Sequence, residues 1–222
     1  MRGSARSASD QQTHAAAKPA RSLIKRAIDI TGSAVTLFFI APLLLLIALV
    51  IRLHDGGSVF YGHRRLGLAG AEFTCWKFRT MVPDAHQVLT DHLAANPEAE
   101  KEWLETQKLT DDPRVTGIGA FLRKTSLDEI PQLWNVLIGE MSLIGPRPIV
   151  RSELDRYGKD RRYYLLVRPG ISGLWQVSGR SNTTYERRIA FDREYAIKWS
   201  FKRDLEIILK TLPAVLKADG AR

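Results

Sequence analysis

A long uncharged segment near the N-terminus constrains this chain more than any other feature. No charged side chain occurs between Asp29 and Arg52, where the sequence reads ITGSAVTLFFIAPLLLLIALVI. As a helix rising ~1.5 Å per residue, this segment would be about 33 Å long, close to the thickness of the hydrocarbon core of a bilayer. It is too long for the apolar part of a signal peptide, and no clear small-residue cleavage site follows it. We therefore expect the chain at a membrane.

Pro42 lies in the middle of the apolar segment. Proline removes a backbone donor and clashes with the preceding helical turn, so we expect a break at Ala41 and Pro42. Basic residues flank the segment on both sides, whereas a spanning helix normally has them mainly on one side. The flanking residues are Arg21, Lys25 and Arg26 before it, and Arg52, Arg64 and Arg65 after it. The pattern favours a re-entrant helix–break–helix over residues 21–54, with a single spanning anchor as the alternative.

The rest of the chain is long enough for one compact domain. Of its 222 residues, 45% are hydrophobic, and the formal net charge of +9 favours anionic partners. Residues 1–20 have almost no large apolar side chains and are predicted to be a disordered tail. We assign residues 55–216 to a cytosolic domain and 217–222 to a second tail. A single cysteine excludes an intramolecular disulfide and Cys-rich metal sites, which suits a reducing compartment.

The sequence predicts an α+β fold that is mainly helical. Residues 59–81 alternate apolar and basic side chains between glycines, which is typical of short strands or a hairpin. Residues 84–108 predict two helices interrupted at Asn96 and Pro97, and a third helix is expected to begin near Pro131. Residues 168–180 are expected to form a loop. From Phe201 onward the apolar spacing predicts an amphipathic helix, either packed on the core or lying at a membrane surface.

The adjacent acids Asp128 and Glu129 are the strongest candidates for chemistry. Ser126 and Glu129 also fit a helix capping box, which would give the pair a purely structural role. Arginines in short Gly/Pro-bounded or polar segments favour a functional role, because their planar guanidinium groups bind phosphate oxygens at two points. Arg147 lies between two prolines that restrict its backbone. A carboxylate pair among arginines near a membrane indicates phosphoryl transfer, with one acid as nucleophile and the other as a ligand of Mg²⁺.

Several long segments resemble one family, the monotopic phosphoglycosyl transferases or bacterial sugar transferases. The resemblance extends over residues 21–212 and rests on KRAIDITGS, WKFRTM, DDPRVT, LRKTSLDEIPQLWNVLIGEMSLIGPRP, RPGISGLWQVSGR and FDREYAIKWSFKRDLEIILKTL. Members of this family start the assembly of exopolysaccharides, capsules and O-antigens. Many members have Ser-Pro at the helix break, whereas this chain has Ala41 and Pro42, without a hydroxyl that could satisfy a freed backbone group.

The resemblance implies a two-step reaction. Asp128 would attack the β-phosphorus of a UDP-sugar, release UMP and hold the sugar phosphate covalently, and polyprenyl phosphate would then take it. Glu129, together with Asp128, would hold Mg²⁺. The residues implied in binding are Arg147, Arg168, Gln176 and Arg180 for substrate phosphate and nucleotide, and Arg123, Lys77 and Arg79 for polyprenyl phosphate.

The resemblance also implies where the protein acts and on what. We expect the bacterial inner membrane, with the re-entrant segment and interfacial amphipathic helices placing the active site on the cytoplasmic face. The expected partners are UDP-galactose or UDP-glucose, undecaprenyl phosphate, membrane lipids and a second copy in a homodimer, and no nucleic acid. The alternative is a membrane-anchored basic binding or scaffolding protein without catalysis, which accounts for the charge but leaves Asp128 and Glu129 without a role.

Overall fold

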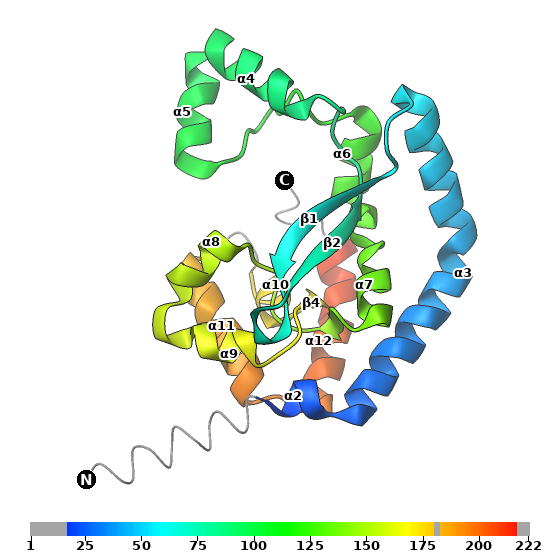
Figure 1. Ribbon diagram of the computed structural model, residues 1–222, viewed down its shortest axis with the longest axis vertical. Helices are drawn as coiled ribbons and strands as arrows, with labels where there is room; N and C mark the ends of the chain where they lie inside the picture. Colours follow the sequence, from blue (N-terminus) through cyan, green and yellow to red (C-terminus); the bar gives the residue numbers. More distant parts are fainter. Residues whose placement is uncertain (1–16, 180–182, 217–222) are drawn as a thin grey trace. The chain divides into compact units, whose positions relative to one another are not determined.

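The computed structural model describes residues 17–179 and 183–216, and the structural statements below concern these residues (Figure 1). The fold is mostly helical with few strands, which confirms the coarse prediction. In chain order the elements are α2 (Lys18–Arg21), α3 (Leu23–Asp55), β1 (Phe60–Leu66), η1 (Leu68–Gly70), β2 (Glu72–Phe78), α4 (Ala85–Ala95), α5 (Pro97–Thr106), α6 (Gly117–Lys124), η2 (Leu127–Glu129), α7 (Gln132–Ile138), β3 (Ser142–Ile144), α8 (Arg151–Leu154), η3 (Asp155–Asp160), α9 (Arg161–Leu165), β4 (Gly170–Ser172), α10 (Leu174–Val177), α11 (Tyr185–Ile197) and α12 (Phe201–Leu216).

The described residues fall into two compact units. Unit 1 contains residues 17–41, 62–76, 131–179 and 183–216, and unit 2 contains residues 42–61 and 77–130. Each unit has its own buried side chains, so each is described separately.

Helix α3 contains the whole apolar segment and continues through Pro42. Among the described residues it is the one helix long and apolar enough to cross a membrane, and only 11% of its most apolar window is buried. The structure does not confirm the expected break at Ala41 and Pro42. A proline removes one N–H donor from the backbone hydrogen bonds of a helix, and the residues on both sides keep their own N–H donors. The re-entrant arrangement therefore stays a prediction.

Helix α2 begins inside the segment that the sequence assigns to an N-terminal tail. Ala17 and Pro19 are buried, so the chain is packed from this point onward. Residues 1–16 and 217–222, which make up most of the two predicted tails, lie outside the described residues.

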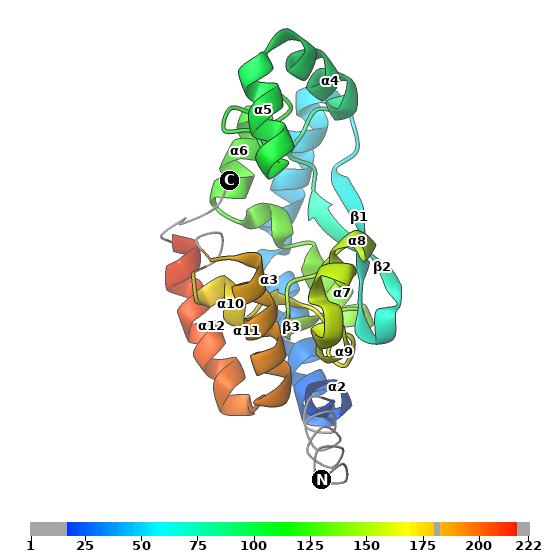
Figure 2. The same ribbon diagram turned by 90° about the vertical axis from the view of Figure 1, so that its left-hand side faces the viewer.

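Unit 1 is built around a short parallel pair of strands and the C-terminal helices. Strands β3 and β4 pair with Ser142 opposite Gly170 and Ile144 opposite Ser172. Helix α9 contacts α11, and α10 contacts both α11 and α12 (Figure 2). The prediction of a loop over residues 168–180 was wrong at β4 and α10. A Cβ on Gly145 would lie 2.3 Å from the Arg168 carbonyl oxygen, so the backbones pair only because this side chain is missing.

Unit 2 has a core where the second half of α3 meets β2 and α6. Ile47, Ile51, Phe78 and Leu122 form its buried cluster. The predicted interruption between α4 and α5 is confirmed, since the Asn96 side chain accepts hydrogen bonds from the first turn of α5.

The predicted hairpin is also confirmed. Strands β1 and β2 form a two-stranded sheet joined by a short turn in which the Gly67 N–H donates to the Ala71 carbonyl over 2.7 Å. Strand β2 ends just before Arg79 and Thr80, which lead toward the acidic pair described next.

Candidate active site

Asp128 and Glu129 lie in the 3₁₀ turn η2, immediately before α7 in the chain. Pro131 is the N-cap of α7, as predicted from its missing N–H. The capping box is not formed, however: Ser126 adopts a left-handed conformation with φ 57° and its side chain makes no capping hydrogen bond. The Ser126 side chain therefore does not provide the cap that the sequence allowed, and both acids contact Lys77 instead.

The two carboxylates share one ammonium group. The Lys77 Nζ, from the end of β2, lies 2.6 Å from Glu129 Oε1 and 3.5 Å from Asp128 Oδ2. Asp128 is 8% exposed, so its carboxylate is largely removed from water. Burial raises the pKa of Asp128 above its ordinary value, whereas the charges of Lys77 and Arg123 act in the opposite direction. The site is thus a desolvated carboxylate surrounded by cations.

Arg123 lies on α6, in the last turn before η2. Its Nε donates a hydrogen bond to Thr80 Oγ1 over 3.0 Å. Burial lowers the pKa of Arg123, while the carboxylates of Asp128 and Asp112 favour its charged form. Asp112 in turn is bound by Arg114, whose Nε and Nη2 lie 2.8 and 2.7 Å from the two carboxylate oxygens.

Two predicted phosphate-binding residues in unit 2 make other contacts. Arg79 pairs with Asp55 at the end of α3 and packs against Gly57, where a Cβ would overlap its guanidinium. Lys77 contacts the acids, as described above. Arg79 therefore ties the end of α3 to β2, and any role in binding polyprenyl phosphate stays a prediction.

The other predicted binding residues belong to unit 1. Arg147 follows β3 and is half-buried, close enough to Arg65 for its charge to lower the Arg65 pKa, although burial of Arg65 is the larger cause. Gln176 is buried on α10. Arg180 lies outside the described residues.

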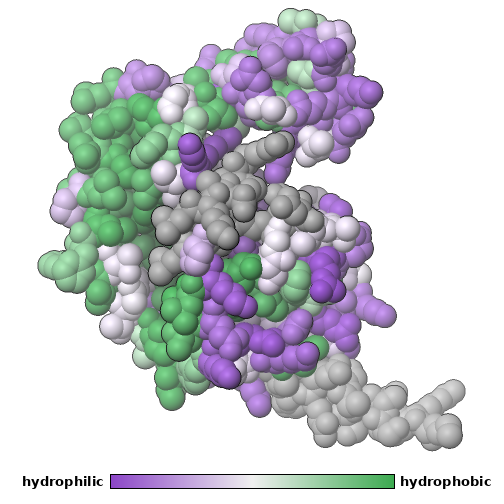
Figure 3. Space-filling view, turned by 180° about the vertical axis from the view of Figure 1, so that it is seen from behind, coloured by the Kyte–Doolittle hydropathy of each residue, from purple (hydrophilic) through white to green (hydrophobic). Residues whose placement is uncertain are grey.

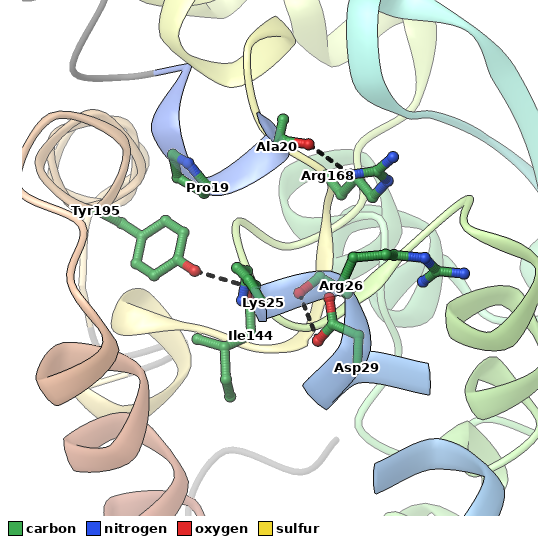
Figure 4. A pocket seen from close by; sticks show the side chains of 9 residues that line it. Pro19, Ala20, Lys25, Arg26, Asp29, Ile144, Arg168 and Tyr195 are labelled. Atoms are coloured by element: carbon green, nitrogen blue, oxygen red, sulfur yellow. Dashed lines mark hydrogen bonds between the residues drawn. The ribbon is translucent and has the colours of Figure 1, made fainter. Parts of the chain in front are cut away.

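Arg168 donates hydrogen bonds to two backbone carbonyl groups, one after α7 and one in α2. Its Nε donates to the Gly139 carbonyl over 2.9 Å. Its Nη1 donates to the Ala20 carbonyl over 3.1 Å (Figure 4). Arg26 donates to the carbonyls of Val136 and Leu137, at the last turn of α7. Both arginines thus satisfy backbone acceptors that a helix end leaves open.

A small polar cavity of about 10 Å³, close to the size needed for one water, lies beside these arginines (Figure 4). Lys25 pairs with Asp204 at 2.7 Å, and Asp29 accepts hydrogen bonds from Ser142 Oγ and the Leu143 N–H, each over 3.0 Å. No local sequence pattern predicts these contacts, because the partners are more than 100 residues apart. The Lys25–Asp204 ion pair and the hydrogen bonds of Asp29 hold the first turns of α3 against the rest of unit 1, which indicates a structural role.

The acidic pair fits a magnesium ion by its chemistry. Mg²⁺ prefers hard oxygen ligands and commonly takes one or two carboxylates, with substrate phosphate and water completing its shell. The described residues contain no cluster of three or more His, Cys, Asp or Glu side chains, so they supply at most such a partial set. Because Lys77 contacts both acids, a cation bound there would share the carboxylates with its ammonium group.

Comparison with known proteins identifies the family. The model of the family described as bacterial sugar transferase matches residues 20–218. The chain belongs to the bacterial sugar transferases. One similar member is the exopolysaccharide production protein ExoY of Rhizobium meliloti (strain 1021), which is 47% identical over the full length of both chains.

Two larger bacterial sugar transferases are similarly close. The UDP-galactose-lipid carrier transferase of Erwinia amylovora and the undecaprenyl-phosphate galactose phosphotransferase of Salmonella typhimurium are each 48% identical over 92% of this chain. The matched region is 43% of each of those proteins, so the chain spans less than half of their length.

Proposed function

We propose that this bacterial sugar transferase moves a hexose-1-phosphate from a UDP-sugar to undecaprenyl phosphate through a covalent aspartyl intermediate. The observation that carries the proposal is the buried Asp128 carboxylate beside the charges of Lys77 and Arg123. The names of the similar proteins, which include an undecaprenyl-phosphate galactose phosphotransferase and a UDP-glucose:undecaprenyl-phosphate glucose-1-phosphate transferase, support the substrate classes.

In the first step, a carboxylate oxygen of Asp128 attacks the β-phosphorus of the donor. The bond from that phosphorus to the bridging oxygen breaks, and UMP leaves with the electron pair. In the second step, an oxygen of undecaprenyl phosphate attacks the same phosphorus and displaces the Asp128 carboxylate. Polyprenyl diphosphate sugar is the product, and the enzyme returns to its starting state.

Burial makes Asp128 a stronger nucleophile by removing water from its carboxylate, but an anion must still approach an anionic diphosphate. Lys77 and Arg123 reduce that repulsion, since both charges act on the Asp128 carboxylate. Glu129 would hold Mg²⁺, which supplies further charge neutralisation on the phosphate oxygens.

Glu129→Gln is therefore expected to raise the Mg²⁺ concentration needed for UMP release. An unchanged dependence of UMP release on Mg²⁺ concentration would rule out Glu129 as a ligand.

The donor's nucleotide and phosphates are assigned to the residues that the family resemblance implies. Arg147 between its two prolines, Gln176 on α10 and Arg180 are the proposed binding residues, and Arg65 adds a second positive charge near Arg147. Arg168 supports this region through its backbone contacts to Gly139 and Ala20.

The protein is proposed to act at the cytoplasmic face of the inner membrane. Hydrophobic side chains cover the exposed surface of α3 (Figure 3), where Phe38 and Phe39 are 77% and 74% exposed. Helix α12 also exposes apolar side chains at helical spacing: Phe201, Leu205, Ile208 and Leu209. The exposed apolar side chains support membrane contact by α3 and by α12, and the re-entrant course of α3 stays a proposal.

The test is UMP release from a panel of UDP-sugars, with and without undecaprenyl phosphate. Wild-type protein quenched with donor alone should carry a hexose-phosphate adduct by intact mass, and Asp128→Asn should lose both adduct and UMP release while remaining folded. Asp111→Asn is the matched control, because it makes the same carboxyl-to-amide change in the DDPRVT motif, outside the acidic pair. Normal UMP release by Asp128→Asn would refute the covalent step. Metal-independent binding to many polyanions without turnover would instead favour the non-catalytic alternative.

A further inference from the structure

Thr80 is a buried residue of unit 2 that the proposed reaction leaves without a role. It follows β2 and is only 8% exposed. Its hydroxyl oxygen accepts the Nε–H of Arg123 over 3.0 Å, and its carbonyl oxygen accepts the Thr116 N–H over 3.1 Å. Thr80 therefore contacts α6 at two points, once at its N-cap and once at its last turn.

The backbone of α6 lies directly against Thr80. A Cβ on Gly119 would be 2.0 Å from the Thr80 carbonyl oxygen and 2.7 Å from the Thr80 carbonyl carbon. No side chain fits in this space, so glycine is what allows the helix to approach. Because residues four apart lie on one face of a helix, Arg123 extends from the same face as Gly119.

The contact with Thr80 uses one edge of the Arg123 guanidinium. Among the described residues, the Arg123 side chain makes a single hydrogen bond, which is the one to Thr80. Binding at Nε leaves Nη1 and Nη2, which form the end-on fork that grips a phosphate or carboxylate at two oxygens. A guanidinium on a flexible stem gains most from such a contact when its rotation is already restricted.

We propose that Thr80 is a positioning residue, whose hydroxyl fixes the Nε edge of Arg123 so that its Nη1 and Nη2 are presented to a substrate phosphate beside Asp128. The inference rests on the proposed function and on the role that the family resemblance implies for Arg123, which is binding the phosphate of the polyprenyl acceptor. According to this inference, tight binding of the acceptor phosphate requires a hydroxyl at position 80 in addition to the acidic pair.

The experiment compares Thr80→Val, which keeps the shape and removes the hydroxyl, with Thr80→Ser, which keeps the hydroxyl. Thr80→Val should raise the KM for undecaprenyl phosphate, and the Kd for a short-chain polyprenyl phosphate, by about tenfold, or about 1.4 kcal/mol. Thr80→Ser should stay within about twofold of wild type. Thr90→Val, on exposed α4, is the matched control for loss of a threonine hydroxyl.

A double-mutant cycle separates positioning from general support of the fold. If Thr80 acts through Arg123, Thr80→Val should add nothing to the effect of Arg123→Gln on the Kd. Additive effects, or equal Kd values for wild type and Thr80→Val, would overturn the inference. Failure of the proposed function shows itself differently, as no UMP release by wild type with any UDP-sugar, and the binding measurement still decides the role of Thr80 in that case.

Discussion

At the scale of single residues, burial decides how the acids of this chain behave. Asp128 is buried beside Lys77 and Arg123, whose charges favour its ionised form against the effect of burial. Asp192 is buried with a neutral partner instead: it accepts a hydrogen bond from the Tyr157 hydroxyl over 2.7 Å. Burial raises the pKa of Asp192 to about 7, with the hydrogen bond from Tyr157 and the nearby charge of Arg188 acting against this change. Burial raises the pKa of both carboxyl groups, and their neighbours differ: Asp128 faces the charge of Lys77, whereas Asp192 is hydrogen-bonded to a neutral hydroxyl.

The raised pKa of Asp192 predicts a pH-dependent stability. Its ordinary value near 3.8 applies to the unfolded chain, so between about pH 4 and pH 7 the folded state binds more protons. The contribution of Asp192 to the free energy of unfolding should therefore be largest below pH 4 and should fall as the pH rises to 7. At 1.36 kcal/mol per pKa unit, this fall is at most about 4 kcal/mol.

Asp192→Asn tests this prediction. Asparagine resembles the protonated acid, so the fall in stability between pH 4 and pH 7 should largely disappear in denaturant unfolding curves. Asp160 lies in the same unit and is more exposed, so Asp160→Asn should keep the wild-type dependence of stability on pH. A variant curve parallel to wild type across this range would assign the pH dependence to other groups.

At the scale of elements, close backbone approach places the site. Helix α6 and β2 converge because Gly119 lies against Thr80, and β3 and β4 converge because Gly145 lies against the backbone of Arg168 and Gly170. Polar caps then fix the element ends: Thr116 begins α6 by accepting the Gly119 N–H over 2.9 Å.

Gly119→Ala is expected to destabilise unit 2 and reduce UMP release. Its Cβ would overlap the Thr80 carbonyl, so α6 must shift, at a cost of about 1–3 kcal/mol. Gly117→Ala is the matched control two residues earlier, because a Cβ there meets nothing within 4 Å and alanine favours a helix by about 0.5–1 kcal/mol. Thermal unfolding of both variants measures the difference, and equal melting temperatures would contradict the close approach.

At the scale of the whole molecule, the apolar surface determines where the protein can reside. Helix α3 exposes most of its apolar side chains, and exposing them to water would be costly unless lipid covers them. A buried ion pair from Lys25 and hydrogen bonds from Arg26 and Asp29 hold the first turns of α3 against the rest of unit 1.

Cysteine labelling tests the re-entrant topology. Cys75 is the only native cysteine and is buried, so it can be replaced by serine to remove background. Arg21→Cys and Ser58→Cys then place reporters before and after α3. Both should react with a membrane-impermeant reagent only from the cytoplasmic side of vesicles of known orientation. Labelling of the two sites from opposite sides would establish a spanning anchor.

The sequence by itself determined the apolar segment, the hairpin, the interruption at Asn96, the start of α7 at Pro131 and the family, because these depend on local composition or on long recognisable motifs. Tertiary structure decided the rest. It joined Lys77 to both acids, Thr80 to Arg123 and Lys25 to Asp204, and it turned part of an expected loop into β4 and α10. These contacts link residues far apart in the chain, and they form only when a core or a missing side chain brings two backbones together, which no local pattern encodes.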